Sequence, residues 1–343
     1  MTKNKNRAAL LIFIGLLALV AAGCGGKSEE SVIKKIEGTL GDITGYKAEA
    51  EMTMRTGQEE RSYAVDIWYK KGEEDFYRVG LENEEEEGGQ VILKNDEGVF
   101  VLTPALKKSF KFQTEWPENS SQPYLYQSLV HDVLSDKDAT FTDTESHYVF
   151  LTKTNYQNST NLPYQEVYFD KKSYTPTGVK IMDKDQNVLV EVSFGNMDVN
   201  PSFAQNDFDR ESILKDTMTD TSVANMEQLE LSVMYPLKTL GAELVEKQET
   251  SLEDGERVIM TFKGDRNFTL IQEKMSAMPT SSSGEMVEEV TGDVVNLGFT
   301  VGAITNNAIE WNYNGTDFYL ASEDMTMEEM IEVASSIEGQ EIK

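Results

Sequence analysis

Side chains that commonly carry out catalysis are scarce in this chain. It contains one cysteine, Cys24, and two histidines, His131 and His147. These counts exclude a Cys/His zinc site and a Cys–His nucleophile pair. There is also no GxSxG nucleophile motif, phosphate-binding loop or GxGxxG motif. We therefore expect no catalytic residue, no metal site and no cofactor, and a protein that is not an enzyme. Both histidines are expected to be structural or exposed.

One acidic segment has the opening spacing of a calcium-binding loop. Asp183, Asp185 and Asn187 stand at the positions of its first three ligands. Val188 occupies the position where such a loop needs glycine, and Phe194 the position where it needs glutamate. The segment therefore predicts a turn between two strands rather than a metal site.

The residues before Cys24 predict a covalent modification of that cysteine. The segment from Leu10 to Cys24 is the only long apolar run, and it follows three basic residues, Lys3, Lys5 and Arg7. A basic start, an apolar stretch and small residues before a break are typical of a secretory signal peptide. The run is shorter than the ~20 residues that a membrane-spanning helix needs.

The end of this run resembles the bacterial lipobox, in which the cysteine receives lipid and becomes the first residue of the mature protein. The residues are Ala21-Ala22-Gly23-Cys24, and they differ from the usual pattern at Ala21, where leucine is common. Two acyl chains suffice to hold a protein stably at a membrane. The resemblance implies a cell-membrane lipoprotein, anchored at Cys24 on the extracytoplasmic face. An ordinary cleaved signal and an uncleaved anchor are the alternatives.

Charge and length limit the possible partners. The 343 residues include 31 basic and 60 acidic side chains, a net charge of −29. Such a body repels nucleic acid phosphates and anionic lipid headgroups, so we expect no nucleic acid partner and attachment to the membrane through lipid alone. A chain of this length typically folds into about two domains, so we expect two. Because Cys24 is the only cysteine, no disulfide can form within the chain.

The periodicity of apolar residues predicts an α+β fold rich in strands. An amphipathic helix is expected from Lys27 to Asp42, with Ser28 as its N-cap, and another between Leu125 and Leu134. Short alternating runs separated by turns fill much of the region 46–197. Many adjacent strands with short turns indicate an antiparallel sheet, and a sheet of this length curls.

A second, smaller unit is expected after a polar, weakly patterned region at 200–225. It has several short strands and a last helix, Met327–Ser336, which starts with the capping box of Thr326 and Glu329. We place the boundary near residue 220. The predicted division is a signal peptide at 1–23, a lipid-anchored domain at 24–220 and a small α+β domain at 221–343.

The strands of the first unit carry more apolar and aromatic side chains than a sheet with one buried face requires. A curled sheet has a concave side that must be filled by helices or by a ligand, and methionine-rich apolar cavities suit such ligands. The residues expected to bind an apolar ligand are Met52, Met54, Trp68, Phe76, Phe100, Leu102, Phe110 and Phe112. The alternative is that they are core residues beneath the two helices.

Three segments of the first unit carry a family resemblance. Asp75–Val79, Asn95–Pro104 and Lys108–Phe110 are similar to the lipoprotein carrier (LolA) superfamily, in which a strand with an aromatic–Arg pair precedes a hairpin with a polar-Gly turn. The resemblance covers roughly residues 30–210 and is closest to LolA-like lipoproteins of endospore-forming Gram-positive bacteria, of the YdcC and GerS type. It implies an unclosed antiparallel barrel with a helical lid over a hydrophobic cavity, and a contact between Arg78 and the lid. Cys24 departs from carriers that shuttle between membranes.

The C-terminal part resembles a small module of unknown function found on Gram-positive membrane-associated proteins. The matching segments are Ile309–Gly315, Phe318–Leu320 and Glu328–Met330. Together these features give two hypotheses. The first is a membrane-anchored protein that binds an acyl chain, a lipoprotein or a partner segment in its cavity, with a role in sporulation or germination. The second is an interaction protein with a filled core that docks a partner enzyme or sensor at the membrane.

Overall fold

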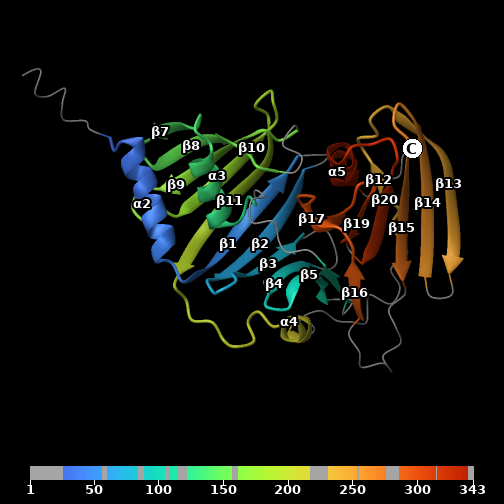
Figure 1. Ribbon diagram of the computed structural model, residues 1–343, viewed down its shortest axis with the longest axis horizontal. Helices are drawn as coiled ribbons and strands as arrows, with labels where there is room; N and C mark the ends of the chain where they lie inside the picture. Colours follow the sequence, from blue (N-terminus) through green and yellow to red (C-terminus); the bar gives the residue numbers. More distant parts are fainter. Residues whose placement is uncertain are drawn as a thin grey trace, which may run out of the picture.

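The protein is mostly β-structure with few helices, arranged as two packed sheets (Figure 1). The structure, a computed structural model, describes residues 26–55, 60–83, 89–104, 108–113, 122–156, 161–216, 231–252, 255–275, 286–313 and 315–338. No helix within these ranges is long and apolar enough to cross a membrane.

The larger sheet joins twelve of the described strands in the order β16-β6-β5-β4-β3-β2-β1-β11-β10-β9-β8-β7. All neighbours are antiparallel except β16 and β6, and the sheet keeps two free edges, so it is curved but not closed. The strands are β1 (Gly45–Met54), β2 (Arg61–Lys70), β3 (Phe76–Glu82), β4 (Gln90–Asn95), β5 (Gly98–Thr103), β6 (Lys108–Phe112), β7 (Thr140–Asp143), β8 (His147–Lys153), β9 (Tyr164–Asp170), β10 (Pro176–Met182), β11 (Val188–Val199) and β16 (Met286–Val290).

The second sheet is antiparallel, with seven described strands in the order β13-β14-β15-β20-β19-β18-β17. Its strands are β13 (Ala242–Leu252), β14 (Gly255–Gly264), β15 (Phe268–Met275), β17 (Asp293–Asn296), β18 (Val301–Ile304), β19 (Ala308–Tyr313) and β20 (Thr316–Ala321). A short pair, β12 (Tyr235–Pro236) and β21 (Ile337–Glu338), lies beside it.

Four described helices complete the fold: α2 (Glu29–Asp42), α3 (Tyr126–Ser135), α4 (Arg210–Asp216) and α5 (Met327–Ser335). Ser28 caps α2 as predicted, since its hydroxyl accepts a hydrogen bond from the backbone of Ser31. The capping box of Thr326 and Glu329 at α5 is also confirmed.

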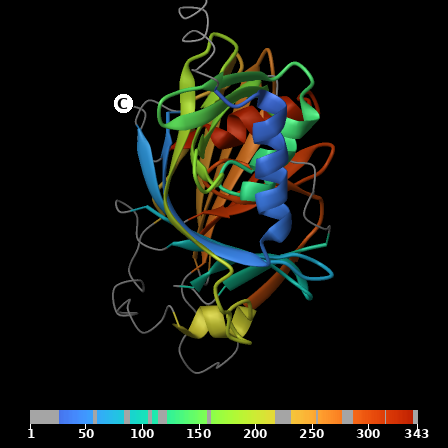
Figure 2. The same cartoon turned by 90° about the vertical axis from the view of Figure 1, so that its left-hand side faces the viewer.

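The two faces of the larger sheet have different covers. We call the face that carries Tyr46 and Tyr63 the inner face. Tyr46 contacts α3 through a hydrogen bond from the Tyr126 backbone at 3.1 Å, and the hydroxyls of Tyr63 and Tyr313 lie 3.2 Å apart between the sheets. Helices α2 and α3 thus cover one half of the inner face and the second sheet covers the other, as Figures 1 and 2 show.

Several elements were not expected from the sequence, namely α4, β16, β17 and the short pair β12 and β21, and the first two show why. Helix α4 lies in the region that we took as polar and weakly patterned, and its Ile213 and Leu214 are buried. Strand β16 has two glutamates among its five residues, so it lacks a clear apolar pattern, yet it pairs with β6 and buries Val290. Both elements are defined by contacts with distant strands rather than by local periodicity.

Candidate functional site

The structure places the eight predicted ligand-binding residues on opposite faces of the larger sheet. Four of them belong to the core on the inner face: Met52, Met54, Phe110 and Phe112. The other four belong to a separate cluster on the outer face: Trp68, Phe76, Phe100 and Leu102. Alternation could not assign β5 to one face, because Val99 to Thr103 are all buried.

The outer cluster is closed by the segment after β11. Phe203, Phe208 and the buried leucine and isoleucine of α4 pack on it. The ring of Phe208 lies 5.8 Å from that of Phe76, and the ring of Phe203 lies 6.3 Å from that of Trp68. Phe100 is only 1% exposed. Phe100 and Leu102 are therefore fully buried, whereas Trp68 and Phe76 are partly buried; we call these four residues the outer cluster.

Arg78 contacts this same covering segment. Its guanidinium donates to the backbone oxygen of Asp207 at 3.3 Å and lies 4.6 Å from the ring of Trp68. It stands on the face opposite α2 and α3, because its cross-strand partner is Trp68. The contact with a helical lid that the resemblance implied is thus replaced by a contact with residues 203–216. Sequence reasoning missed Asn95, whose amide donates to the oxygen of Phe208 at 3.0 Å.

On the inner face, the two phenylalanines and the two methionines have different surroundings. Phe110 and Phe112 are 3% and 4% exposed and lie within the core, with Lys108 above the ring of Phe110. Met52 and Met54 line a cavity of about 310 Å³. Only this pair of the eight predicted residues meets that space.

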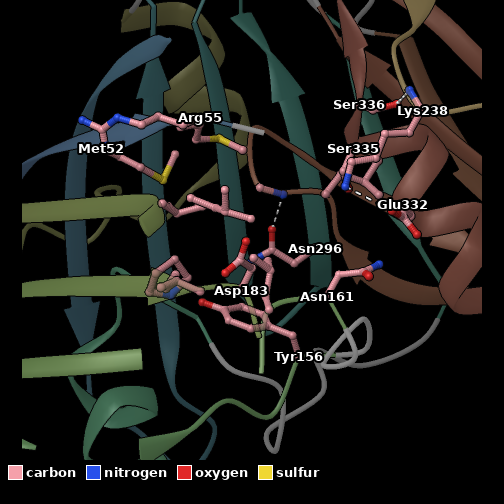
Figure 3. A pocket seen from close by; sticks show the side chains of 18 residues that line it. Met52, Arg55, Tyr156, Asn161, Asp183, Lys238, Asn296, Glu332, Ser335 and Ser336 are labelled. Atoms are coloured by element: carbon pink, nitrogen blue, oxygen red, sulfur yellow. Dashed lines mark hydrogen bonds and ion pairs between the residues drawn. The ribbon is translucent and has the colours of Figure 1, made fainter. Parts of the chain in front are cut away.

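The cavity lies where the end of β1 and the β10–β11 turn meet the C-terminal part of the chain (Figure 3). Its wall is largely apolar: Met52, Met54, Pro123, Leu162, Ile181, Leu189, Val190 and Leu297. Gly298 completes the wall at a φ of +92°, and a Cβ atom there would lie 2.5 Å from the Met54 methyl group. Glycine is therefore required both by backbone conformation and by the close approach to methionine.

Polar groups around the cavity are held by one another. Lys238 pairs with Glu332 at 3.1 Å, and Asn296 donates to Gln122 at 2.8 Å. In Figure 3, Lys238 and Glu332 lie on the side formed by α5, across from Met52 and Arg55. Lys238 and Asn296 are thus engaged, whereas the buried hydroxyl of Tyr156 has no hydrogen-bond partner among the described residues. The rest of the wall offers a ligand a mainly apolar surface.

Asp183 also borders the cavity, and it belongs to the segment that resembled a calcium loop. Its carboxylate accepts hydrogen bonds from the backbone of Asp185 and from the backbone and side chain of Asn187. Hydrogen bonds from Asn187 lower the pKa of the Asp183 carboxyl. The predicted turn between β10 and β11 is confirmed. No group of three or more potential metal ligands gathers within the described residues.

Tyr156 is a further wall residue that the sequence did not single out. It is 9% exposed, and burial raises the pKa of its hydroxyl well above the ordinary value. The phenol is therefore neutral at physiological pH. Tyr156, Leu162 and Leu297 come from segments without strong periodicity, so only the folded arrangement identifies them.

A buried polar network joins the two sheets beside the core. The side chain of Gln90 donates to the backbone oxygen of Asn312 at 2.8 Å, and Lys108 forms an ion pair with Asp317. Desolvation raises the pKa of the Asp317 carboxyl, with Lys108 opposing the shift. Glu310 lies nearby, and burial raises the pKa of its carboxyl as well.

The lipidation candidate, Cys24, lies outside the described residues. The structure begins at Gly26, next to Asp143 of β7. The structure therefore shows where the chain joins the folded body, at Gly26 beside β7.

Comparison with known proteins identifies relatives along the whole chain. A family model described as "Sporulation protein YdcC-like" matches residues 4–208. "Sporulation protein YdcC" of Bacillus subtilis (strain 168) is 44% identical over 343 residues, which cover 99% of this chain and 100% of the relative.

Solved structures give only remote likenesses. A chain of the Pseudomonas aeruginosa MucA/MucB complex is 13% identical, covers 90% of this chain and 99% of its own, and has a TM-score of 0.34. A LolA superfamily protein of Nitrosomonas europaea is 10% identical, covers 55% and 100%, and has a TM-score of 0.31. A chain of the Clostridioides difficile complex of the CwlD amidase with the GerS lipoprotein is 15% identical, covers 52% and 98%, and has a TM-score of 0.22. At these scores the likenesses carry no argument.

Proposed function

Because the chain belongs to the YdcC-like family of sporulation proteins, we propose that it is a membrane-anchored protein that binds an apolar ligand in the cavity beside Met52 and Met54. The ligand is an acyl chain, free or on a lipoprotein, or an apolar segment of a partner. The process served is sporulation or germination. The protein acts by binding rather than by catalysis.

The observation that carries this proposal is the cavity itself. Its volume of about 310 Å³ falls at the lower end of the range for small-molecule sites. Unbranched methionine side chains adapt to ligands of irregular shape, and apolar burial is the main source of affinity for them. The cations nearest the cavity, Arg55 and Lys238, already pair with Glu60 and Glu332, which favours a neutral or apolar ligand group in the interior.

The anchoring part of the proposal depends on Cys24. The signal-like run and the sole cysteine at its end support acylation and a position on the extracytoplasmic face of the cell membrane. In this proposal α2 and α3 act as the helical lid of a LolA-like barrel, and residues 221–343 act as a second, smaller domain. The pairing of β16 with β6 means that this domain contributes a strand to the first sheet.

Titration with a fluorescent fatty acid tests the cavity. The protein is the chain from residue 24 with Cys24→Ser, which prevents acylation. Met54→Trp fills the space, and we expect at least tenfold weaker probe binding. Val199→Trp introduces the same side chain at a position that is 38% exposed on the same sheet, and should leave affinity unchanged. Equal affinity in both variants, or no binding by the parent protein, would contradict the proposal.

Dense packing under the helices favours a second candidate function. Val32 and Ile36 of α2 and Leu129 of α3 are at most 2% exposed, so this half of the inner face is filled by the protein itself. A filled core suits an interaction protein that docks a partner enzyme or sensor at the membrane. Mass spectrometry of organic extracts from natively purified protein separates the two functions. A stoichiometric acyl species supports the ligand, whereas absence of both extracted lipid and probe binding supports docking.

A further inference from the structure

The chain enters the folded body between two turns at one end of the larger sheet. Gly26 lies against Asp143, at the end of β7. The Lys27 ammonium donates to the hydroxyl of Tyr174, in the turn between β9 and β10, and lies 5.9 Å from the ring of Tyr148. Ser28 then caps α2 directly. The first described residues are thus held by the body from Gly26 onward.

The covalent distance from this point to Cys24 is short. Gly26 is two residues after Cys24. Even a fully extended chain spans at most about 7 Å over two residues. An acylated Cys24 would therefore hold the entry point of the chain close to the bilayer surface, with no linker long enough to let the body move away.

We infer that the end of the molecule formed by the β7–β8 turn (144–146) and the β9–β10 turn (171–175) rests against phospholipid headgroups. This inference depends on the acylation of Cys24 in the proposed function. Its partner is the surface of the membrane that carries the anchor. In Figure 1 this end, with α2 and β7, lies opposite the end formed by β13.

The chemistry of the two turns fits a contact imposed by the tether rather than by charge. Lys171 pairs with Asp143 and donates to the backbone oxygen of Thr144 at 2.5 Å. The carboxylate of Asp170 accepts hydrogen bonds from the Lys172 backbone and from Ser173. Exposed Glu145 and Lys172 offset each other. The charges of the two turns nearly balance, and the exposed Glu29 and Glu30 of α2 follow the entry point directly, so electrostatic attraction does not hold this end at the bilayer.

This orientation also places the cavity at the end of the larger sheet that lies away from the membrane surface. Strand β10 starts at Pro176, next to the β9–β10 turn, and ends at Met182, next to Asp183 of the cavity. Its seven residues extend about 23 Å at 3.3 Å per residue. The cavity therefore lies at the other end of β10, up to about 23 Å along the strand from the turn that contacts the headgroups.

Fluorescence quenching in reconstituted vesicles tests the inference on the acylated full-length protein. The thiol of an acylated Cys24 does not react, so Ser146→Cys, Lys172→Cys and Gln248→Cys each give one labelling site. Gln248 is exposed on β13 and serves as the distant control. With a quencher on the lipid headgroups, we expect at least threefold stronger quenching at positions 146 and 172 than at 248, in both phosphatidylcholine and phosphatidylcholine/phosphatidylglycerol vesicles.

A linker variant gives the decisive comparison. Ten Gly/Ser residues inserted after Gly26 add a mean span of about 17 Å and should lower quenching at 146 and 172 to the level at 248. Flotation of vesicles first establishes whether the protein is attached. Attached protein with equal quenching at all three positions would overturn the orientation but not the anchor. Protein that does not float with vesicles would overturn the anchor and, with it, this inference.

Discussion

The larger sheet carries an apolar cluster on each face, and the two clusters differ in what closes them. On the outer face, Trp68 and Phe100 are covered by the segment 203–216, which follows β11 directly in the chain. On the inner face, Met52 and Met54 meet segments from the C-terminal part, which leave a cavity of about 310 Å³. The buried side chains of the outer cluster thus lie beneath adjacent chain, whereas Met52 and Met54 border open space. The comparison teaches that burial alone does not identify a binding surface.

Truncation in the outer cluster should have the largest effect on stability. Phe100→Ala removes a ring that is 1% exposed, and we expect a loss of about 3–5 kcal/mol in the free energy of unfolding. Urea denaturation measures it, with Val199→Ala as a surface control that should change stability by less than about 0.5 kcal/mol. Probe affinity of the folded fraction should stay unchanged. Weaker probe binding by folded Phe100→Ala protein would show that the two clusters are not independent.

The sequence was sufficient for elements whose apolar pattern is local. The alternation in β1 and β2 and the capping box of α5 identified these elements directly. The outer cover was missed because Ile213 and Leu214 lie in a helix of seven residues, whose burial depends on side chains from β3 and β5. Of the residues that line the cavity, the sequence named Met52 and Met54, but it placed Phe100 on the same concave side, whereas Phe100 belongs to the outer cluster.

The polar attachment of the outer cover should have the next largest effect. Asn95 is 6% exposed, donates to the Phe208 oxygen at 3.0 Å and accepts from the backbone of Glu97 at 2.9 Å. Asn95→Ala removes both hydrogen bonds and leaves the Phe208 oxygen and the Glu97 N–H without this partner. We therefore expect the free energy of unfolding to fall by about 1–3 kcal/mol, with faster proteolysis within 203–216. Asn206→Ala, at an exposed position of the same segment, is the matched control. Equal proteolysis of both variants would show that Asn95 does not hold the cover.

The cap of α5 tests the wall of the cavity. Thr326 accepts from the Glu329 backbone at 3.2 Å, and the Glu329 carboxylate accepts from the Thr326 backbone at 2.9 Å. Thr326→Ala should lower the free energy of unfolding by about 1 kcal/mol and weaken probe binding slightly, since Glu332 and Ser335 of α5 line the cavity. Thr326→Ser keeps the hydroxyl and should behave as the parent. If the serine variant loses as much stability as the alanine variant, the hydrogen bond is not the cause.

The smallest expected effect is on the pH dependence of stability, and it comes from Asp317 in the buried polar network between the two sheets. The pKa of Asp317 is raised by burial, so the folded state keeps a proton that the unfolded chain has already released. Stability from this group is present below the unfolded pKa of about 3.9 and is lost as pH rises through the folded pKa. Asp317→Asn should remove this fall in stability with rising pH, whose slope is at most about 1.4 kcal/mol per pH unit.

Glu329 provides the opposite case, because the Arg266 side chain lowers the pKa of its carboxyl. Its stability is present above the unfolded pKa and lost as pH falls, so Glu329→Gln should flatten the acid limb instead. Urea denaturation of both variants between about pH 3 and pH 7 distinguishes the two contributions. If Asp317→Asn leaves the falling limb intact, that limb does not come from Asp317, and Glu310, whose pKa burial also raises, is the next group at this junction to test.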